Sequence, residues 1–337
     1  MTDPQRPTAP PSTGDRSRGA ATSLAVDIGG TKLAAGLVTA GGEVLARRER
    51  PTPLAGPGHA ALVTEALFAL LDEVLGTAPS TQRPGVPAAG TAVGLACAGP
   101  LDLVAGTVSP VNIPAWRDEP LVARVQEQLA SPTVRLVNDA VAMTVGEHAR
   151  GAARGAANVL GVVVSTGVGG GLVLDGLPRL GPTGNAGHVG HTVVAVDGDP
   201  CPCGSRGCVE TRASAPAMVR DALARGWRPP SGGTGEPPDG RLLARAAGRG
   251  DPVALAAIDR GTAALAAGIV SAAALLDLDV VVIGGGFAAA GEVLLAPLRR
   301  HLDLLAGMAF LRRLRVVPAQ LGRDAGLVGA ALIAQQR

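Results

Sequence analysis

The sequence predicts a two-domain α/β protein with a metal-binding loop, and three observations lead to this prediction. The chain has 337 residues, enough for two domains of ordinary size. A strand, a glycine-rich turn and a second strand follow one another at residues 24–50 and again at 158–176, which indicates two related halves. Three of the four cysteines fall within residues 184–210, a turn-rich stretch typical of a loop folded around a metal ion.

Composition narrows the class of protein. Hydrophobic residues make up 47% of the chain and aromatic residues 1%, so we expect a large core of closely packed Ala, Val and Leu. The formal net charge is +2 and the basic residues form no block, which argues against an electrostatic nucleic-acid surface. The few cysteines fit a reducing compartment, and the sequence has neither a signal peptide nor an unbroken membrane-spanning run. We therefore expect a cytoplasmic protein without a nucleic-acid or membrane partner.

The chain divides where its composition changes. Residues 1–22 are rich in Pro, Ser, Thr and Arg, cannot bury an apolar face and should be disordered. We assign residues 23–135 to a smaller N-terminal α/β domain, completed by a returning C-terminal helix at 322–337. Residues 136–321 are assigned to a larger α/β domain. Within it, the Pro- and Gly-rich segment 228–240 is expected to be a loop or an insertion.

The first glycine-rich turn is a candidate phosphate site. Asp27 ends the opening strand, and the turn after it contains Gly29, Gly30, Thr31 and Lys32. Two glycines let backbone N–H groups approach a phosphate, and the threonine and lysine add side-chain donors. An ordinary hairpin turn is the alternative. The chain has no Gly-Lys-Ser/Thr sequence, which excludes a P-loop nucleotide site.

The next part of the chain supplies a candidate general base. Its pattern predicts a helix at 58–76, a buried strand at 92–98 and then a loop that contains Asn112. A further strand ends at Asn138 and Asp139, where another helix begins. Either residue would be a good helix N-cap, which accounts for many such pairs. A carboxylate at the end of a strand that faces a cleft is also where a kinase would place its base, so Asp139 is the catalytic candidate.

Two more glycine-rich turns lie in the second half. Thr166 and Gly167 join the two strands of 158–176 and form a second candidate phosphate-binding turn. A buried β-hairpin without a ligand is the alternative interpretation. Gly285 and Gly286 follow a buried strand and precede a helix. They either allow tight packing of strand on helix or form a nucleotide-binding turn.

The loop at 184–210 contains a complete set of zinc ligands. Cys201, Cys203 and Cys208 are soft donors, and His191 precedes them in the chain. Three thiolates and one imidazole make the tetrahedral set of a structural zinc site, with no position left open for water. A disulfide is the alternative, but Cys201 and Cys203 are too close in sequence to bridge without strain.

These motifs resemble a known family. The pattern Gly-x-x-Gly-x-x-Gly-His, followed by Cys-x-Cys-Gly-x-x-Gly-Cys-x-Glu, resembles the zinc loop of the ROK family (repressors, open reading frames and sugar kinases). The resemblance runs from about residue 24 to residue 336 and implies an actin-like (ribonuclease H-like) two-domain sugar-kinase fold. Most members have glutamate at the position of His188. The segment AGHVGHT is instead similar to the bacterial N-acetylmannosamine kinases within the family.

The resemblance implies a role for each candidate residue. Asp139 would take the proton from the sugar hydroxyl that attacks ATP, and Asp27 would lie near the Mg²⁺ of ATP. Backbone N–H groups of the glycine-rich turns would hold the phosphates. The sugar would be bound by Asn112, Asn138, His188, His191 and Glu210.

The implied activity is ATP-dependent phosphorylation of the 6-hydroxyl of N-acetylmannosamine, supported by Mg²⁺ and a structural Zn²⁺, and we expect a homodimer. A glucokinase or N-acetylglucosamine kinase on the same fold is the nearest alternative. A non-catalytic sugar-sensing regulator is another, although Asp139 and the shortness of residues 1–22, which leave no room for a DNA-binding domain, argue against it. A purely structural metal-stapled domain would leave the phosphate-type turns unexplained.

Overall fold

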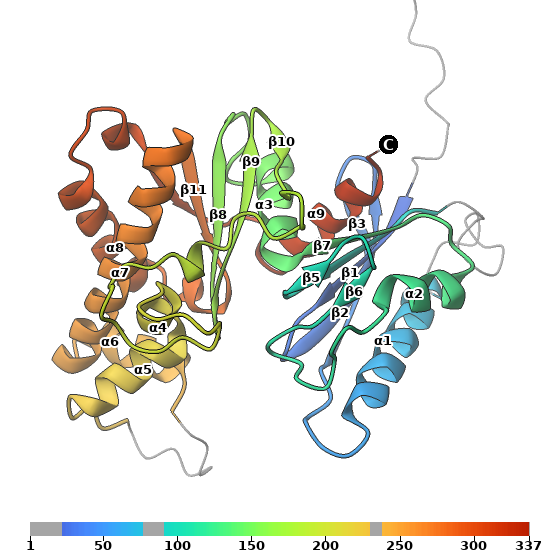
Figure 1. Cartoon of the computed structure of the whole chain (residues 1–337), viewed down its shortest axis with the longest axis horizontal. Helices are drawn as coiled ribbons and strands as arrows, with labels where there is room; N and C mark the ends of the chain where they lie inside the picture. The colour runs from blue at the N-terminus through green and yellow to red at the C-terminus, as the bar shows by residue number, and fades with distance from the viewer. Residues whose placement is uncertain (1–21, 77–90, 230–237, 337) are drawn as a thin grey trace, which may run out of the picture.

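The structure, a computed structural model, describes residues 22–76, 91–229 and 238–336. Two lobes stand side by side, each built around one five-stranded sheet, and two helices lie between them (Figure 1). Apart from Thr22, which begins the first strand, the predicted tail lies outside the described residues, as does most of the predicted segment 228–240.

The sheet of the first lobe has the strand order β3-β2-β1-β4-β7. β2 runs antiparallel to both β1 and β3, whereas β4 and β7 run parallel to β1. The central strands are buried along nearly their whole length because both faces of the sheet are covered by helices. The strands are β1 (Thr22–Ile28), β2 (Lys32–Thr39), β3 (Val44–Pro51), β4 (Val93–Cys97) and β7 (Val134–Asn138).

The outer face of this sheet is covered by α1 (His59–Gly76) and α2 (Leu121–Leu129), as Figure 1 shows. A short hairpin of β5 (Leu101–Asp102) and β6 (Thr107–Val108) leads from β4 towards α2. The predicted division between residues 135 and 136 falls inside β7, because this strand pairs with β4 and so extends the first sheet up to Asn138.

The sheet of the second lobe repeats the first. Its order is β10-β9-β8-β11-β12, with β9 antiparallel to β8 and β10 and with β11 and β12 parallel in the direction of β8. The two sheets thus share one strand order and one set of directions, which confirms the two related halves predicted from the glycine-rich turns. The strands are β8 (Val159–Val164), β9 (Val168–Leu174), β10 (Leu177–Pro178), β11 (Val280–Gly284) and β12 (Arg315–Pro318).

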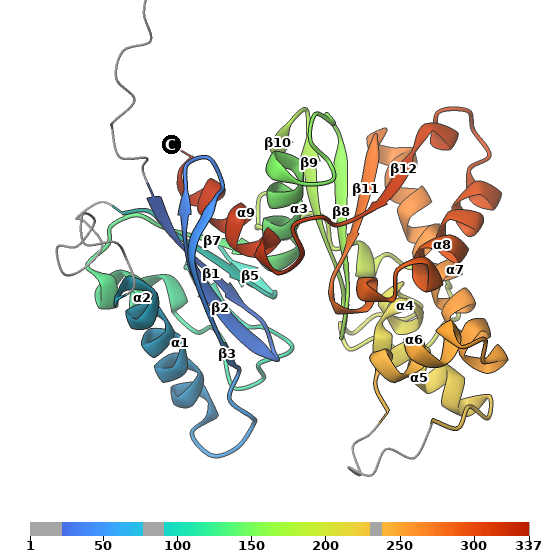
Figure 2. The ribbon, with the colours of Figure 1, turned by 180° about the vertical axis from the view of Figure 1, so that it is seen from behind.

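Helices of the second lobe cover the face of its sheet that is turned away from the first lobe (Figure 2). They are α4 (Glu210–Ala213), α5 (Ala215–Ala224), α6 (Gly240–Gly248), α7 (Pro252–Leu276) and α8 (Glu292–Leu305), with the 3₁₀ turns η2 (Val189–His191), η3 (Gly286–Ala290), η4 (Leu311–Arg313) and η5 (Gly322–Asp324). Within the described residues, α7 alone is long and apolar enough to cross a membrane, but 56% of its most apolar window is buried in the protein, as in an ordinary core helix.

The two helices between the lobes are α3 (Asp139–Arg150) and α9 (Ala325–Ala334). They touch closely because glycines face the partner backbone: a Cβ on Gly146 would lie 2.3 Å from the carbonyl oxygen of Ala325, and one on Gly329 would lie 1.7 Å from that of Ala142. α9 also packs on β1 and β4.

Candidate active site

The first predicted phosphate turn is a closed hairpin turn between β1 and β2. The N–H of Gly29 donates to the carbonyl of Lys32 (3.0 Å), and the hydroxyl of Thr52 donates to the carbonyl of Gly29 (2.6 Å). A Cβ on Gly30 would lie 2.6 Å from the Cβ of Asn112, so a side chain there would displace Asn112. The glycine therefore brings the predicted sugar ligand Asn112 against the predicted phosphate turn.

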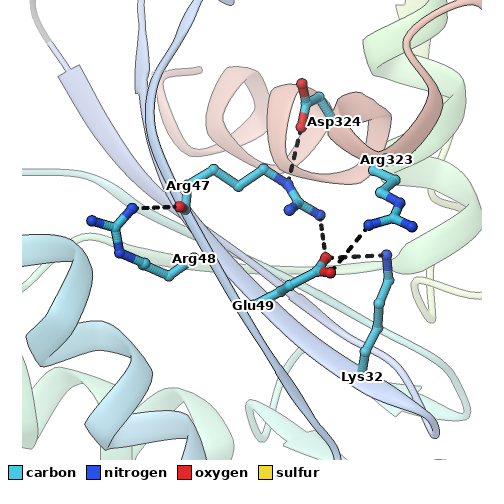
Figure 3. A network of polar contacts seen from close by, with 6 residues as sticks. All are labelled: Lys32, Arg47, Arg48, Glu49, Arg323 and Asp324. Carbon is cyan, nitrogen blue, oxygen red and sulfur yellow. Dashed lines mark hydrogen bonds and ion pairs between the residues drawn. The ribbon is translucent and has the colours of Figure 1, made fainter.

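Lys32 lies in a network of charges rather than alone beside the turn (Figure 3). Its Nζ is 3.7 Å from Oε2 of Glu49, which also pairs with Arg47 at 2.6 Å, while Oε1 of Glu49 is 3.1 Å from Nη1 of Arg323. The hydrogen bond from Arg47 holds the pKa of Glu49 below its usual range. The network joins strands β2 and β3 to the start of α9, where Arg47 also pairs with Asp324. A contact of Lys32 with phosphate stays a prediction.

Asp27 and Asp139 form a pair of interacting carboxylates. Burial raises the pKa of Asp27 to about 6, and the negative charge of Asp139 adds to the rise. Burial also raises the pKa of Asp139, against the lowering effect of the Ala140 N–H. A Cβ on Gly326 would lie 2.6 Å from Oδ2 of Asp27, so this carboxylate lies against the first turn of α9. Two buried carboxylates, one of which raises the pKa of the other, suit a divalent cation such as Mg²⁺, which would relieve their repulsion.

The junction of β7 and α3 positions both predicted residues. Asn138 is the N-cap of α3: its Oδ1 accepts from the N–H of Ala140 at 3.0 Å. Oδ1 of Asp139 accepts from the same N–H at 2.8 Å. The capping interpretation is therefore correct for Asn138, and Asp139 is the first residue of the helix, with its second carboxylate oxygen outside this bond.

Three polar side chains gather around Gly99. A Cβ on this glycine would lie 3.5 Å from Nδ2 of Asn138, 3.5 Å from Cε1 of His188 and 3.7 Å from Oδ1 of Asn185. The sequence did not single out Asn185. Its Nδ2 donates to the carbonyl of Leu101 at 3.1 Å, so it ties the loop ahead of the cysteines to the first lobe. Its position among the glycines of the predicted zinc loop was the available signal.

His188 stacks on His191, with ring centroids 5.9 Å apart and ring planes 18° from parallel. Among the described residues, Nε2 of His188 is buried and has no hydrogen-bond partner. Burial lowers the pKa of His188 and the neighbouring His191 lowers it further, while Glu210 opposes this. The ring is therefore neutral at physiological pH, with one nitrogen as donor and the other as acceptor.

The second and third glycine-rich turns are neighbours. Oε2 of Glu210 accepts from the N–H of Val168 at 2.8 Å, and a Cβ on Gly167 would lie 2.5 Å from the same oxygen. Gly285 has φ of 91°, and a Cβ there would lie 2.5 Å from the carbonyl oxygen of Val164. Thr166, Gly167, Gly285 and Gly286 thus surround the end of β8, with Glu210 at the same turn.

The four predicted metal ligands lie together. The donor atoms of His191, Cys201, Cys203 and Cys208 are all within 4.8 Å of one another. Cys203 and Cys208 have their sulfurs 3.8 Å apart, and all four cysteines of the chain are free, which excludes the disulfide alternative. Three thiols and one imidazole at this spacing fit a structural zinc ion.

The thiols of this cluster differ in acidity. The N–H of Ser205 lowers the pKa of Cys203, whereas burial raises the pKa of Cys208 and raises that of Cys201 to about 12. Zinc binds thiolates, so metal binding would release protons from this cluster and weaken as the pH falls.

The loop with these ligands lies on a glycine-lined strand. A Cβ on Gly170 of β9 would lie 2.4 Å from the carbonyl oxygen of Gly187, and one on Gly190 would lie 1.9 Å from that of Val168. On the same strand, a Cβ on Gly171 would lie 2.5 Å from Cα of Val141 in α3. The glycines of β9 thus let the metal-ligand loop and α3, which begins at Asp139, approach one strand closely.

Comparison with known proteins gives consistent results. The family model described as the ROK family matches residues 23–337. A glucokinase from Streptomyces coelicolor is 34% identical over 93% of this chain and 98% of its own, and an N-acetylmannosamine kinase from Escherichia fergusonii is 36% identical over the same shares. The crystal structure of a ROK family glucokinase from Streptomyces griseus in complex with glucose and AMPPNP is 33% identical, covers 94% of this chain and all of that one, and has a TM-score of 0.78.

Proposed function

Because the chain belongs to the ROK family, we propose that it phosphorylates the 6-hydroxyl of N-acetylmannosamine with ATP, giving N-acetylmannosamine 6-phosphate and ADP. Sugar kinase activity is supported by relatives of both specificities, which match almost the whole chain. The use of ATP is supported by the AMPPNP complex of the similar glucokinase. The observation that supports the proposal is that Asp139 follows Asn138 at the start of α3 and lies close enough to Asp27 to raise its pKa.

Asp139 is the proposed general base. A carboxylate whose pKa is raised by burial is a stronger base than one in water, and the hydroxyl becomes more acidic as it attacks phosphorus. The N–H of Ala140 holds one carboxylate oxygen and leaves the other to accept the proton. The start of α3 fixes the direction of the side chain, which aligns the hydroxyl for in-line attack.

The phosphates are the proposed ligands of the glycine-rich turns. Backbone N–H groups around Gly29–Gly30 in the first lobe and around Thr166–Gly167 in the second would bind them, apart from the N–H of Gly29 itself, which donates to Lys32. Gly285–Gly286 would lie at the adenosine. Lys32 reaches the phosphates once it leaves Glu49, an exposed ion pair of small energy. Mg²⁺ would neutralise phosphate charge, with Asp27 holding it directly or through water.

The presence of a histidine at position 188 favours N-acetylmannosamine over glucose as the substrate. Ionised glutamate only accepts hydrogen bonds, which suits hydroxyls, whereas a neutral imidazole can donate to an acetamido carbonyl. Burial lowers the pKa of His188, which favours the neutral ring, and Nε2 of this residue has no hydrogen-bond partner among the described residues. The amide side chains of Asn138 and Asn185, which lie beside His188, can form hydrogen bonds with other polar groups of the sugar. The alternative is that His188 only stacks on the metal ligand His191 and keeps its ring in position.

A panel of hexoses tests the proposal. ADP release is measured with glucose, mannose, N-acetylglucosamine and N-acetylmannosamine, and the highest kcat/KM is expected for N-acetylmannosamine. Glucokinase is the second candidate, because the glucokinases are nearly as similar along their full length. The highest kcat/KM for glucose would select it. No ADP release with any sugar, while sugar binding persists, would favour a sugar-sensing regulator.

One substitution tests the role of His188. His188→Glu should move the ratio of kcat/KM values for N-acetylmannosamine and glucose towards glucose, by about tenfold or more, since a donor to the acetamido carbonyl is replaced by a charged acceptor. His188→Gln, which keeps a donor, should stay closer to the wild type. An unchanged ratio in both variants, with zinc retained, would leave His188 only its supporting role.

The remaining proposals concern the oligomeric state of the protein and its location in the cell. We propose a homodimer that acts in the cytoplasm, where ATP is abundant and thiols stay reduced. Size-exclusion chromatography with light scattering tests the first point, and a monomeric mass at micromolar concentration would reject it.

A further inference from the structure

A pocket of about 520 Å³ lies outside the proposed kinase site, behind the metal-ligand loop. Its walls come from that loop and from helices α4, α5 and α7. The charged residues that line it are Asp199, Arg212, Arg220, Asp221, Arg225 and Arg260. Four arginines against two aspartates give the lining a net charge of +2, on a chain with the same formal net charge overall.

The arginines are not equivalent. Asp221 organises two of them: its Oδ2 accepts from Nε of Arg260 at 2.9 Å, and its Oδ1 accepts from Nε of Arg225 at 3.0 Å. Arg212 and Arg220 are exposed, and neither side chain has a hydrogen bond or an ion pair with another described residue. The pocket therefore holds two guanidinium groups that have no partner among the described residues and two that the half-buried carboxylate of Asp221 keeps in place.

This arrangement suits a phosphorylated ligand that also has hydroxyl groups. A guanidinium matches phosphate oxygens with paired N–H donors, and several arginines around one cavity favour a dianion. Asp199, from the metal-ligand loop, makes no side-chain hydrogen bond or ion pair with another described residue and can accept from hydroxyls. The volume is in the range of sites for small metabolites and exceeds what a bare phosphate ion needs.

The pocket is joined mechanically to the proposed sugar site. Arg212 lies two residues after Glu210 on the same short helix, and Glu210 binds the N–H of Val168 at the second phosphate-type turn. Between them, the hydroxyl of Thr211 donates to the carbonyl of the metal ligand Cys208 at 2.7 Å. A force on Arg212 therefore reaches Glu210 and the metal-ligand loop through one turn of helix.

We propose that this pocket binds a small sugar phosphate and that its occupancy changes the affinity of the sugar site through α4. The pocket is distinct from the proposed kinase site, and only the choice of a hexose 6-phosphate as the first probe rests on the proposed function. Binding energies of the two sites would then be linked reciprocally.

Calorimetry on the full chain tests the site without turnover. Glucose 6-phosphate is titrated into protein already saturated with sugar and a non-hydrolysable ATP analogue, in phosphate-free buffer of low ionic strength. The variant Arg212→Gln/Arg220→Gln should bind it at least about tenfold more weakly than the wild type, because two charge-assisted contacts are lost. The control Arg135→Gln/Arg154→Gln removes two exposed arginines outside the pocket and should bind like the wild type.

Three further arms separate the outcomes. Equal affinity in the wild type and the Arg212/Arg220 variant, or no binding in either, overturns the site. Inorganic phosphate that binds as tightly as glucose 6-phosphate overturns a sugar-phosphate ligand, and glucose alone should not bind there. Sugar affinity that is the same with and without glucose 6-phosphate in the control variant overturns the link through α4. The single variants, each with its melting temperature measured, replace the double variant should that one fail to fold.

Discussion

Asp139 combines a structural role with a proposed catalytic role on one side chain. Its first oxygen accepts from the N–H of Ala140, as a helix-capping group does, and its second oxygen is left for chemistry. Because Asn138 also caps the helix, α3 does not depend on the charge of Asp139. Structure and catalysis can therefore be separated by a substitution that keeps the shape of the side chain.

Asp139→Asn should leave the fold and sugar affinity nearly unchanged and lower kcat by about 10²- to 10⁴-fold, since an amide cannot accept the hydroxyl proton. Single-turnover kinetics and calorimetric sugar binding measure the two effects. Near-normal turnover with unchanged affinity would mean that Asp139 only caps the helix and that the base lies elsewhere.

Asp27 shows how the same site costs stability. An aspartate in an unfolded chain ionises near pH 3.9, whereas burial raises the pKa of Asp27 to about 6. Between these values the folded state binds more protons than the unfolded state, so stability falls as the pH rises through this window and stays low above it. The folded protein thus holds Asp27 where burial, and to a smaller extent the charge of Asp139, oppose its ionisation, as expected where a cation is to bind.

Asp27→Asn should therefore raise the free energy of unfolding at pH 8, by at most about 3 kcal/mol, with the gain disappearing near pH 4. Urea unfolding at both pH values, without divalent ions, measures the difference. Asp303→Asn, on an exposed turn of α8, is the matched control and should show no such pH-dependent gain. A gain of the same size at pH 4 and pH 8 would contradict the assigned cause.

At the scale of elements, the metal-ligand loop is a segment that a bound metal ion would stabilise through its four ligand residues. Most of its backbone hydrogen bonds lie within the loop itself, among them Cys201 N–H to Ser205 and Gly207 N–H to Asp199, and Gly207 has φ of 65°. Val189 and Val209 anchor its ends in the core, whereas most of residues 193–206 are exposed, so a bound ion would add order to the middle of the loop. Its two ends contain His188 and Glu210, which links the order of the loop to the sugar site.

Cys203→Ser should remove zinc and raise KM for the sugar by about tenfold or more, with a much smaller effect on KM for ATP. Cys203 is the exposed ligand, so the substitution adds no buried polar group. Metal content by atomic absorption and steady-state kinetics give the two readouts. Cys97→Ala in β4 is the control and should keep the metal. A zinc-free wild type with full activity would reject a structural metal.

The sequence predicted these elements well where the signal is local. Asp27, Asn138 and the glycine-rich turns stand at strand ends because an apolar run stops there, and both the run and its end can be read from neighbouring residues. The four metal ligands were found for the same reason. Asn185 and the arginine pocket were missed because their partners are remote: Asn185 binds Leu101, and Arg260 reaches Asp221 from another helix. The pairing of β7 with β4 is equally non-local.

At the scale of the whole molecule, the chain crosses from one lobe to the other after α3 and crosses back after β12 to α9. The buried carboxylate of Glu147 forms hydrogen bonds with both crossing segments. Glu147, near the end of α3, is fully buried. Its Oε2 accepts from the N–H of Ala152 at 2.8 Å, and its Oε1 accepts from the N–H groups of Gln320 and Leu321 at 2.9 and 2.7 Å. The outgoing and returning segments are thus tied at one point.

Glu147→Gln tests this tie. The amide keeps one acceptor oxygen and turns a donor towards N–H groups that the second oxygen satisfied, so at least one buried N–H loses its partner. We expect the free energy of unfolding to fall by about 1–3 kcal/mol, the cost of leaving a buried donor unsatisfied. Glu127→Gln, on the exposed side of α2, makes the same chemical change and should cost little.

A sharper test is to measure where in the protein Glu147→Gln lowers the stability. If Glu147 ties the crossings, hydrogen exchange of the amides of Ala152, Gln320 and Leu321 should accelerate in Glu147→Gln far more than exchange in the cores of the two sheets, because the crossings would open before either lobe unfolds. The lobes would then move more freely, and KM for both substrates should rise together, since the proposed binding residues come from both lobes. Uniformly faster exchange in both sheets would show that Glu147 contributes only to global stability.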